Sequence, residues 1–292
     1  TEMFADAGAL GEHIDPHEWN DYHVIAKGDR ITTIINGHIT NEVVDRSPQA
    51  RRQGVIAFQL HTGRPMTVRL DDIRLKSLFR PLFDGETLDG WDGDPQVWRV
   101  EDGHIVGETT EDGQLEHNTF LIWNEGEPAD FELEFRYRID SEWANSGVQV
   151  RSQRLDGYRV AGYQPDIATV DWITGIHYEE RGRGILARRG QRVTLAPDGE
   201  RTVEEFASED ELFEHIHMDD WNDYRVIAHG NRIVTLINGV KMHELIDDAP
   251  EARRSGVIAF QVHTGPPMRI RLDDINLREI FVPIFNRDNP DE

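Results

Sequence analysis

Cysteine is absent from the 292-residue sequence, which excludes disulfide bonds, thiol chemistry and cysteine-ligated metals. Lysine is almost absent, with only Lys27, Lys76 and Lys241, and 31 basic residues face 55 acidic ones. The resulting net charge of −24 argues against nucleic acid as a partner, because phosphate binding needs clustered positive charge. We interpret the acidic balance as a well-solvated surface rather than as a binding site.

Long apolar runs are also missing. No stretch approaches the roughly 20 apolar residues that a membrane-spanning helix needs, so no membrane span is predicted. No signal peptide is visible, although the sequence opens on Thr1 in the middle of a pattern, which is compatible with a removed signal. The absence of cysteine leaves the cellular compartment open.

What the sequence does contain is an internal repeat. With a shift of 202 positions, residues 19–78 align with residues 221–280 without a gap, and 37 of the 60 positions are identical. Such a period is the size of a whole domain and far longer than a solenoid unit. We therefore predict the C-terminal third of a first domain over residues 1–78, a complete domain over 79–286 and a tail over 287–292.

The repeat also leaves one part without a counterpart. Residues 1–78 match only residues 203–280, so nothing in the sequence matches residues 79–202 a second time. Strands of the first copy would then expose an apolar face and open sheet edges. We expect a missing upstream half-domain, supplied by the same polypeptide or by another chain, to complete this copy.

Strand patterns dominate the complete copy. Phe131, Leu133, Phe135, Tyr137 and Ile139 alternate with charged residues, which is the period of a half-buried strand. Asn36-Gly37 and Asn238-Gly239 separate apolar runs and predict two-residue hairpin turns. The one credible helix is short, around residues 204–214. Many strands with turns between them predict an all-β, two-sheet sandwich of jelly-roll type.

Polar residues at alternate strand positions are the candidate site. In Gly256–His263, Ile258, Phe260 and Val262 share one face, while Gln261 and His263 share the other, which predicts a wet concave surface. A histidine that is hydrogen-bonded at the rim of a sheet is the simpler alternative.

Three further groups have equally plain alternatives. Asn145, Gln149 and Arg151 are predicted to share a face, or else Arg151 forms a surface ion pair. Gly162–Asp166 combines an aromatic, an amide and a carboxylate, or else is an ordinary turn. Glu134 lies on the polar face of its strand, where plain exposure is the alternative.

Taken in order, these motifs resemble the 3-keto-disaccharide hydrolase family. The resemblance covers essentially all of residues 80–280 and the closing third again at 1–78. It is carried by Leu82–Gly85, Leu88–Trp91, Trp98–Gly103, Phe120–Trp123, Asp130–Arg136, Asn145–Gly147, Gly162–Ile167, Tyr178–Arg183 and Gly256–His263 with Pro266–Met268. The sequence departs from the usual pattern at Pro165 and His177.

The resemblance implies a concanavalin A-like jelly roll that acts on glycosides oxidised at C3 of the sugar. It also implies a periplasmic or extracellular location. The site residues carried over are His263, Arg151, Asp166 and Glu134 as catalytic groups, and Asn145, Gln149, Tyr163, Gln164, Tyr178 and Gln261 as substrate-binding groups. A divalent metal held by Glu134, Asp166 or His263 is an alternative to a metal-free site.

The implied chemistry does not need the carboxylate pair of ordinary glycosidases. A ketone at C3 acidifies the proton on C2, and its removal gives an enolate that expels the aglycone from C1, with or without later hydration. His263 is the expected base and Arg151 the expected enolate stabiliser. We therefore expect His263, Arg151, Asp166 and Glu134 to share one cleft, and His61 of the partial copy to be idle.

Two other functions remain open from the sequence. A non-catalytic carbohydrate-binding module would show a shallow aromatic platform and would gain avidity from tandem copies. An ordinary glycoside hydrolase on the same scaffold would show two carboxylates facing each other across the cleft.

Overall fold

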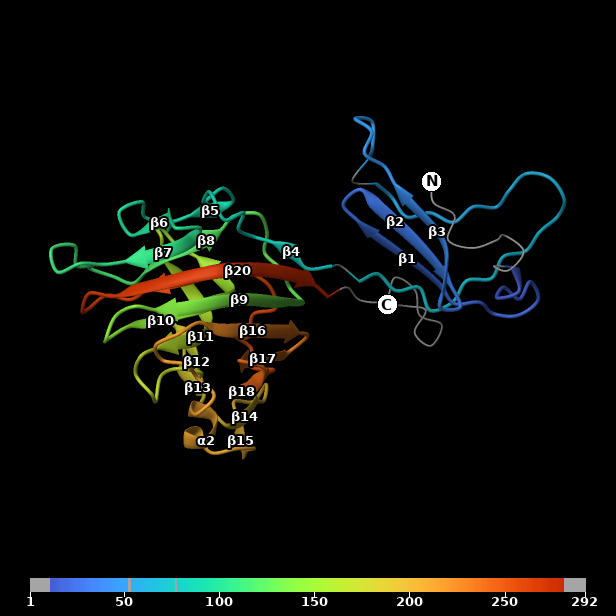
Figure 1. Cartoon of the computed structure of the whole chain (residues 1–292). Helices are drawn as coiled ribbons and strands as arrows, with labels where there is room; N and C mark the ends of the chain where they lie inside the picture. The colour runs from blue at the N-terminus through green and yellow to red at the C-terminus, as the bar shows by residue number, and fades with distance from the viewer. Residues whose placement is uncertain (1–10, 52–53, 77, 281–292) are drawn as a thin grey trace. The chain divides into compact units, whose positions relative to one another are not determined.

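The computed structural model describes residues 11–51, 54–76 and 78–280 (Figure 1). The chain divides into two compact units, residues 1–70 (unit 1) and 71–292 (unit 2). The predicted complete domain, 79–286, falls within unit 2, but its last six residues and the predicted tail lie outside the described residues. Nearly all regular structure is β-strand, as the sequence predicts.

Unit 2 is a sandwich of two sheets (Figure 1). The seven-stranded sheet, called here the pocket sheet, has the order β13-β12-β11-β10-β19-β8-β5. Its strands are β5 (Trp91–Asp92), β8 (Thr119–Trp123), β10 (Asn145–Arg154), β11 (Val160–Ala168), β12 (His177–Glu180), β13 (Gly184–Ala187) and β19 (Val257–Val262). Every neighbouring pair in this sheet is antiparallel.

The ten-stranded sheet, called the back sheet, has the order β15-β14-β18-β17-β16-β9-β20-β7-β6, with β4 pairing to β20. Its strands are β4 (Arg80–Pro81), β6 (Trp98–Glu101), β7 (His104–Glu108), β9 (Phe131–Ile139), β14 (Gln191–Leu195), β15 (Arg201–Glu205), β16 (Asn222–His229), β17 (Arg232–Ile237), β18 (Val240–Asp247) and β20 (Arg269–Glu279). The pair β14–β18 is parallel. This arrangement is a concanavalin A-like jelly roll.

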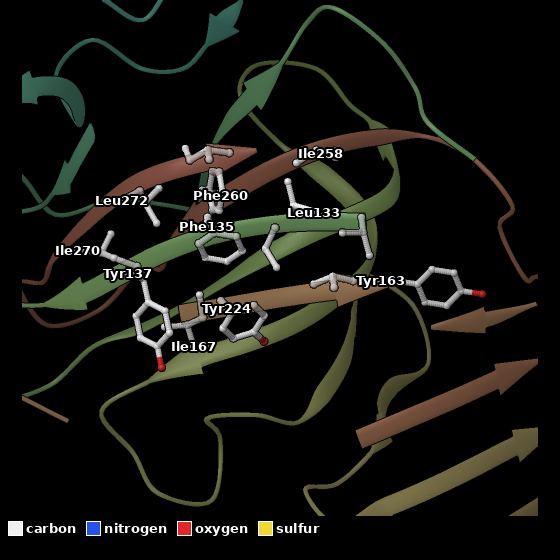
Figure 2. Close-up of a cluster of buried hydrophobic side chains, with 14 of the residues drawn as sticks. Leu133, Phe135, Tyr137, Tyr163, Ile167, Tyr224, Ile258, Phe260, Ile270 and Leu272 are labelled. Carbon is white, nitrogen blue, oxygen red and sulfur yellow. The ribbon is translucent and has the colours of Figure 1, made fainter. Parts of the chain in front are cut away.

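The core lies between the two sheets and follows the predicted alternation. Phe135 of β9 approaches Phe260 of β19 with ring centroids 4.9 Å apart, and Tyr224 of β16 stacks on Phe135 at 5.0 Å (Figure 2). All three rings are almost fully buried. Burying a phenylalanine contributes about 1.5–3 kcal/mol, so this cluster ties the sheets together.

Strand β19 shows how the core positions the site. Ile258, Phe260 and Val262 enter the core, as predicted. Val257 and Ala259 lie on the opposite face in a second apolar cluster. Gln261 continues that outer face. The period of two therefore turns Gln261 away from the core.

The one helix expected in unit 2 is shorter than predicted. Helix α2 covers Glu209–Phe213 and is capped by Ser208, which exchanges hydrogen bonds with Glu211. The first residues of the predicted helix, up to Glu205, instead form β15, which pairs along its whole length with β14.

Unit 1 is a three-stranded antiparallel sheet of β1 (Tyr22–Lys27), β2 (Arg30–Ile35) and β3 (His38–Val44). Asn36 and Gly37 have φ of 48° and 82°, and Asn238 and Gly239 have 51° and 78°. Both predicted Asn-Gly hairpin turns are thus confirmed. Residues 54–60 are not in a strand, although their counterparts form β19.

Among the described residues, no helix is long and apolar enough to cross a membrane.

Candidate functional site

A pocket of about 470 Å³ opens on the face of the pocket sheet that points away from the core. This volume is within the usual range for small-molecule sites. The lining combines five polar side chains, three carboxyl or imidazole groups, one guanidinium group and an apolar part, formed by Asn118, Asn145, Gln164, Tyr178, Gln261, Asp166, Glu180, His263, Arg181, Trp172, Ile173, Ile176 and Ile185.

The register of three neighbouring strands brings the polar groups together. Gly147 of β10 lies opposite Asp166 of β11, and Gln164 of β11 lies opposite Tyr178 of β12. A Cβ atom at Gly147 would come within 2.6 Å of the Gln164 Cγ atom and 3.0 Å of an Asp166 oxygen. Glycine is therefore required at 147 for these two side chains to stand over the strand.

A chain of hydrogen bonds orders the floor of the pocket. The Ser152 hydroxyl donates to Gln149 Oε1 at 2.6 Å, and Gln149 Nε2 donates to Gln164 Oε1. Gln164 Nε2 in turn donates to Asp166 Oδ1 at 2.7 Å and to Gln261 Oε1 at 3.2 Å. Each amide orientation is fixed by its neighbours, so the floor is preorganised before any ligand arrives.

Two polar atoms in this wall have no partner among the described residues. Gln261 Nε2 is a buried donor and Asn145 Oδ1 a buried acceptor. Leaving such an atom unpaired costs about 1–3 kcal/mol. A ligand that offers both an acceptor and a donor, as sugar hydroxyl and carbonyl groups do, would remove that cost.

The pKa values of the two carboxyl groups of the pocket are both raised. Burial raises the pKa of Asp166 well above its ordinary value, against the hydrogen bond from Gln164, and the charge of Glu180 adds to the rise. Burial also raises the pKa of Glu180, against the opposing effects of Asn118, Arg181 and His263.

His263 stands at the end of β19 beside these carboxyls. Its Nδ1 atom contacts the carbonyl oxygen of Thr264, which can only accept, so Nδ1 carries the proton in the neutral ring. The lone pair is then on Nε2. Asn118 holds the same corner by accepting from the Thr264 backbone N–H at 3.0 Å and donating to Glu180 at 3.4 Å.

Arg151 is not in the pocket, contrary to our expectation. Its guanidinium is buried and donates to the carbonyl oxygens of Ala129 and Gly230 and to Asp130 Oδ1. A β-bulge interrupts β10 at this point, and Arg151 has a φ of 49°. The extra residue shifts the alternation, which turns Arg151 away from the face that Gln149 occupies.

Glu134 is also elsewhere, because β9 belongs to the back sheet. It lies on the outer face of that sheet, with Arg225 Nε 3.2 Å away. Of the three candidate metal ligands, Asp166 and His263 line the pocket and Glu134 does not. Across the described residues, no cluster of three or more His, Cys, Asp or Glu side chains is arranged to hold a metal ion.

Two predicted substrate-binding residues lie behind the pocket rather than in its wall. Gln149 is fully buried and reaches the site only through Gln164. Tyr163 faces the core, where its hydroxyl donates to Asp247 at 2.6 Å. The other four, Asn145, Gln164, Tyr178 and Gln261, line the pocket together with Asp166 and His263.

Sequence reasoning missed Asn118, Glu180, Arg181 and the apolar part formed by Trp172 and three isoleucines. Glu180 had a readable signal, because it is two residues after Tyr178 and shares its face of β12. Asn118 and Trp172 are in loops, where no periodicity indicates which side chains converge.

A family model described as the 3-keto-alpha-glucoside-1,2-lyase-like domain matches the chain over residues 6–76 and again over 78–278. The chain belongs to the 3-keto-disaccharide hydrolase family. Members of this family are related to glycoside-cleaving enzymes, so a glycoside or another saccharide is the ligand class that the family indicates. A comparison with curated proteins finds no match.

Solved structures with a similar chain trace are distant. A protein from Parabacteroides distasonis described as a candidate glycosyl hydrolase is 18% identical over 70% of this chain and 100% of its own, with a TM-score of 0.47. A Bacillus subtilis protein with a galectin-like fold is 12% identical, with coverage of 72% and 98% and a TM-score of 0.49. The carbohydrate-binding module CBM66 from Bacillus subtilis is 11% identical, with coverage of 65% and 96% and a TM-score of 0.44.

Proposed function

We propose that unit 2 cleaves 3-keto-glycosides, including 3-keto-disaccharides, by removing the C2 proton and eliminating the aglycone. One observation carries this proposal. The pocket places an imidazole whose Nε2 carries the lone pair beside one buried and one partly buried carboxyl group, Asp166 and Glu180, and the pKa values of both are raised. A base, together with carboxyl groups whose raised pKa values suit them to donate a proton, is what an elimination through an enolate needs.

The first step is assigned to His263. Its Nε2 takes the proton from C2, and the electrons of the broken C–H bond move into the enolate of the C3 ketone. The contact between Nδ1 and the Thr264 carbonyl fixes the ring orientation and stabilises the imidazolium that forms.

Stabilisation of the enolate oxygen is assigned to Asp166, in place of Arg151. A protonated carboxyl group donates a strong hydrogen bond to a developing oxyanion, and burial keeps Asp166 in that form. Gln164 holds one oxygen of this carboxyl, which leaves the group in a fixed orientation. No positive charge is needed at the oxyanion in this arrangement.

Protonation of the leaving group is assigned to Glu180. Collapse of the enolate breaks the C1–O bond, and Glu180 protonates the departing aglycone oxygen. The immediate product is a sugar with a C1–C2 double bond conjugated to the ketone. Addition of water at C1 and return of a proton to C2 would turn the same event into a net hydrolysis.

The test compares the 3-keto and unoxidised forms of one 4-nitrophenyl glucoside, with aglycone release as the readout. We expect release from the 3-keto form only, and incorporation of deuterium at C2 of hydrated product in D2O. His263→Asn, Asp166→Asn and Glu180→Gln should each lose activity, and His229→Asn on the back sheet is the control. Release from the unoxidised glucoside alone would overturn the proposal.

A second candidate is an ordinary glycoside hydrolase, because Asp166 and Glu180 are two carboxyls in one pocket. Such an enzyme needs one of them ionised as base or nucleophile. It would cleave the unoxidised glucoside, and Asp166→Asn would abolish that reaction. Saturable binding without release from either substrate would instead indicate a non-catalytic carbohydrate-binding module.

A further inference from the structure

The two units contain the same segment in different surroundings. Gly54–Gln59 and Gly256–Gln261 are identical in sequence. In unit 2, Phe260 is fully buried and Val257 is 6% exposed, whereas in unit 1 Phe58 is 60% and Val55 93% exposed. Unit 1 therefore presents to solvent the side chains that form the centre of a core in unit 2.

Unit 2 also identifies what is absent from unit 1. Strand β19 is flanked by β8 and β10, and β16 pairs with β9. Strand β20 lies between β9 and β7. All of these neighbours come from residues 79–202, the segment that has no second counterpart in the sequence.

Unit 1 already has the local structure of the completed domain. The hairpin β1–β2 has the same register as β16–β17, with Tyr22 opposite Ile35 as Tyr224 is opposite Ile237. The turn after β2 is also the same, because Asn36 has a φ of 48° and its counterpart Asn238 a φ of 51°. Unit 1 is thus shaped to receive strands rather than unfolded.

The histidine of the pocket is preorganised in the same way. His61 Nδ1 contacts the Thr62 carbonyl oxygen, as His263 Nδ1 contacts that of Thr264. Gln59 corresponds to Gln261, so unit 1 carries both pocket residues that the closing third contributes. The remaining pocket residues all belong to residues 79–202.

A second copy of this chain does not supply what unit 1 lacks. Each copy contains one segment 79–202 and two segments that require it, and the segment is already used within unit 2. If two copies exchanged this segment, it would cover the apolar face of one unit and leave the apolar face of another unit exposed. The completing segment must therefore come from a different stretch of polypeptide.

We propose that unit 1 is the receiving half of a second sandwich, completed by a polypeptide segment homologous to residues 79–202. We further propose that the completed sandwich forms a second glycoside pocket around Gln59 and His61, and this second part rests on the function proposed above.

One position distinguishes the expected segment from residues 79–202 themselves. In unit 2, His243 Nε2 lies 3.0 Å from His177 Nδ1, between the two sheets. The counterpart of His243 in unit 1 is Asn41. At the position that corresponds to His177, the natural segment should therefore carry a side chain that can form a hydrogen bond with the amide of Asn41.

The test joins a copy of residues 79–202 to Thr1 in the full chain. Because the repeat has no gap, residue 202 then precedes residue 1 as it precedes residue 203. Amide hydrogen exchange is followed at residues 55–60, with residues 257–262 as the internal reference and the 292-residue chain as the baseline. We expect at least tenfold slower exchange at 55–60, on the order of 1.4 kcal/mol.

A matched control carries Leu133→Asp and Phe135→Asp in the added copy only, which removes its ability to cover the apolar face. Exchange at 55–60 should stay at the baseline there. Unchanged exchange in the intact fusion would overturn the proposal. Protection of 55–60 already present in the 292-residue chain, as a monomer or a dimer, would also overturn it.

The second pocket is tested in the same fusion with His263→Asn, so that the original pocket is inactive. We expect aglycone release from the 3-keto glucoside to return and to disappear again with His61→Asn. Slow exchange without such activity, in a protein whose 292-residue parent is active, overturns the second pocket alone. An inactive parent overturns the proposed function, and exchange still decides whether the segment docks.

Discussion

Residues 54–59 and 256–261 are the same six residues in two surroundings, and only one of them is a strand. Strand β19 has hydrogen-bonded neighbours on both sides and a core beneath it. The matching residues of unit 1 have neither. The comparison shows that β-structure in this segment is made by the neighbouring strands and not by the intrinsic preference of Val, Ile and Phe.

The hairpins of the two units behave in the opposite way. Asn36-Gly37 and Asn238-Gly239 adopt the same turn, and the strands around them pair in the same register. Asn36 donates to Asn20 as Asn238 donates to Asn222, so both turns are set by residues that the two units share. Local turn chemistry therefore survives the loss of most of the domain, whereas a central strand does not.

The largest expected difference between the units is catalytic. His263→Asn should lower the rate on a 3-keto glucoside by about 10²–10⁴-fold, because asparagine cannot take up the C2 proton. His61→Asn in the 292-residue chain should leave the rate unchanged, since the sequence contains no counterparts of Asp166 and Glu180 to accompany His61. Steady-state aglycone release measures both, and equal losses would refute the assignment.

The next contrast concerns packing. Phe260→Ala should destabilise unit 2 by about 3–5 kcal/mol, because it leaves a cavity against Phe135 and Trp91. Phe58→Ala removes an exposed ring and should change stability by less than about 0.5 kcal/mol. Urea unfolding followed by tryptophan fluorescence compares the two. A large effect at Phe58 would show that unit 1 is covered in solution.

A smaller contrast depends on pH. Burial lowers the pKa of His243 to about 4 and that of His177 well below its ordinary value, where His243 and Arg183 add to the effect. Between these values and 6.5 the unfolded chain binds more protons, so stability present above pH 6.5 is lost as the pH falls toward 4. Tyr163 is the other titratable ring against this pair.

His243→Asn, which introduces the residue found at position 41, should weaken this acid sensitivity of unit 2. Urea midpoints at pH 4.5 and 7.5 measure the difference, and the gap between them should shrink relative to the parent. A gap of the same size in the variant would place the acid-sensitive group elsewhere.

The last comparison should show equal losses of stability in the two hairpins. Asn36→Ala and Asn238→Ala each place an alanine at positive φ and remove the bond to Asn20 or Asn222. Each change should cost its own hairpin about 1–2 kcal/mol. Amide exchange in β2–β3 and in β17–β18 reads the two losses separately. Clearly unequal losses would mean that the hairpins depend on their surroundings.

The sequence was sufficient to predict the strands, the Asn-Gly turns and the two faces of β19, because these follow from local periodicity. It was insufficient for Arg151, since a single bulge at that residue reverses the face on which the side chain lies. Alternation carries no sign of such a bulge until the partner strands are known.

The carboxyl groups illustrate a second limit. Glu134 and Glu180 both lie on polar faces of strands, and alternation treats them alike. They differ because β9 enters the back sheet and β12 the pocket sheet. Which sheet a strand joins is a long-range property, so the face could be predicted but not the pocket.

The exposed segment of residues 55–60 also has a colloidal consequence. It is uncharged, free of proline and rich in residues that favour extended stacking, which are the properties of sequences that seed cross-β fibrils. It is carried by a polypeptide with a net charge of −24, whose mutual repulsion keeps such segments apart. Salt shortens the reach of that repulsion to about 8 Å at physiological ionic strength. Storage buffers of low ionic strength should therefore keep this protein dispersed, and added salt should bring its fibril-prone segments together.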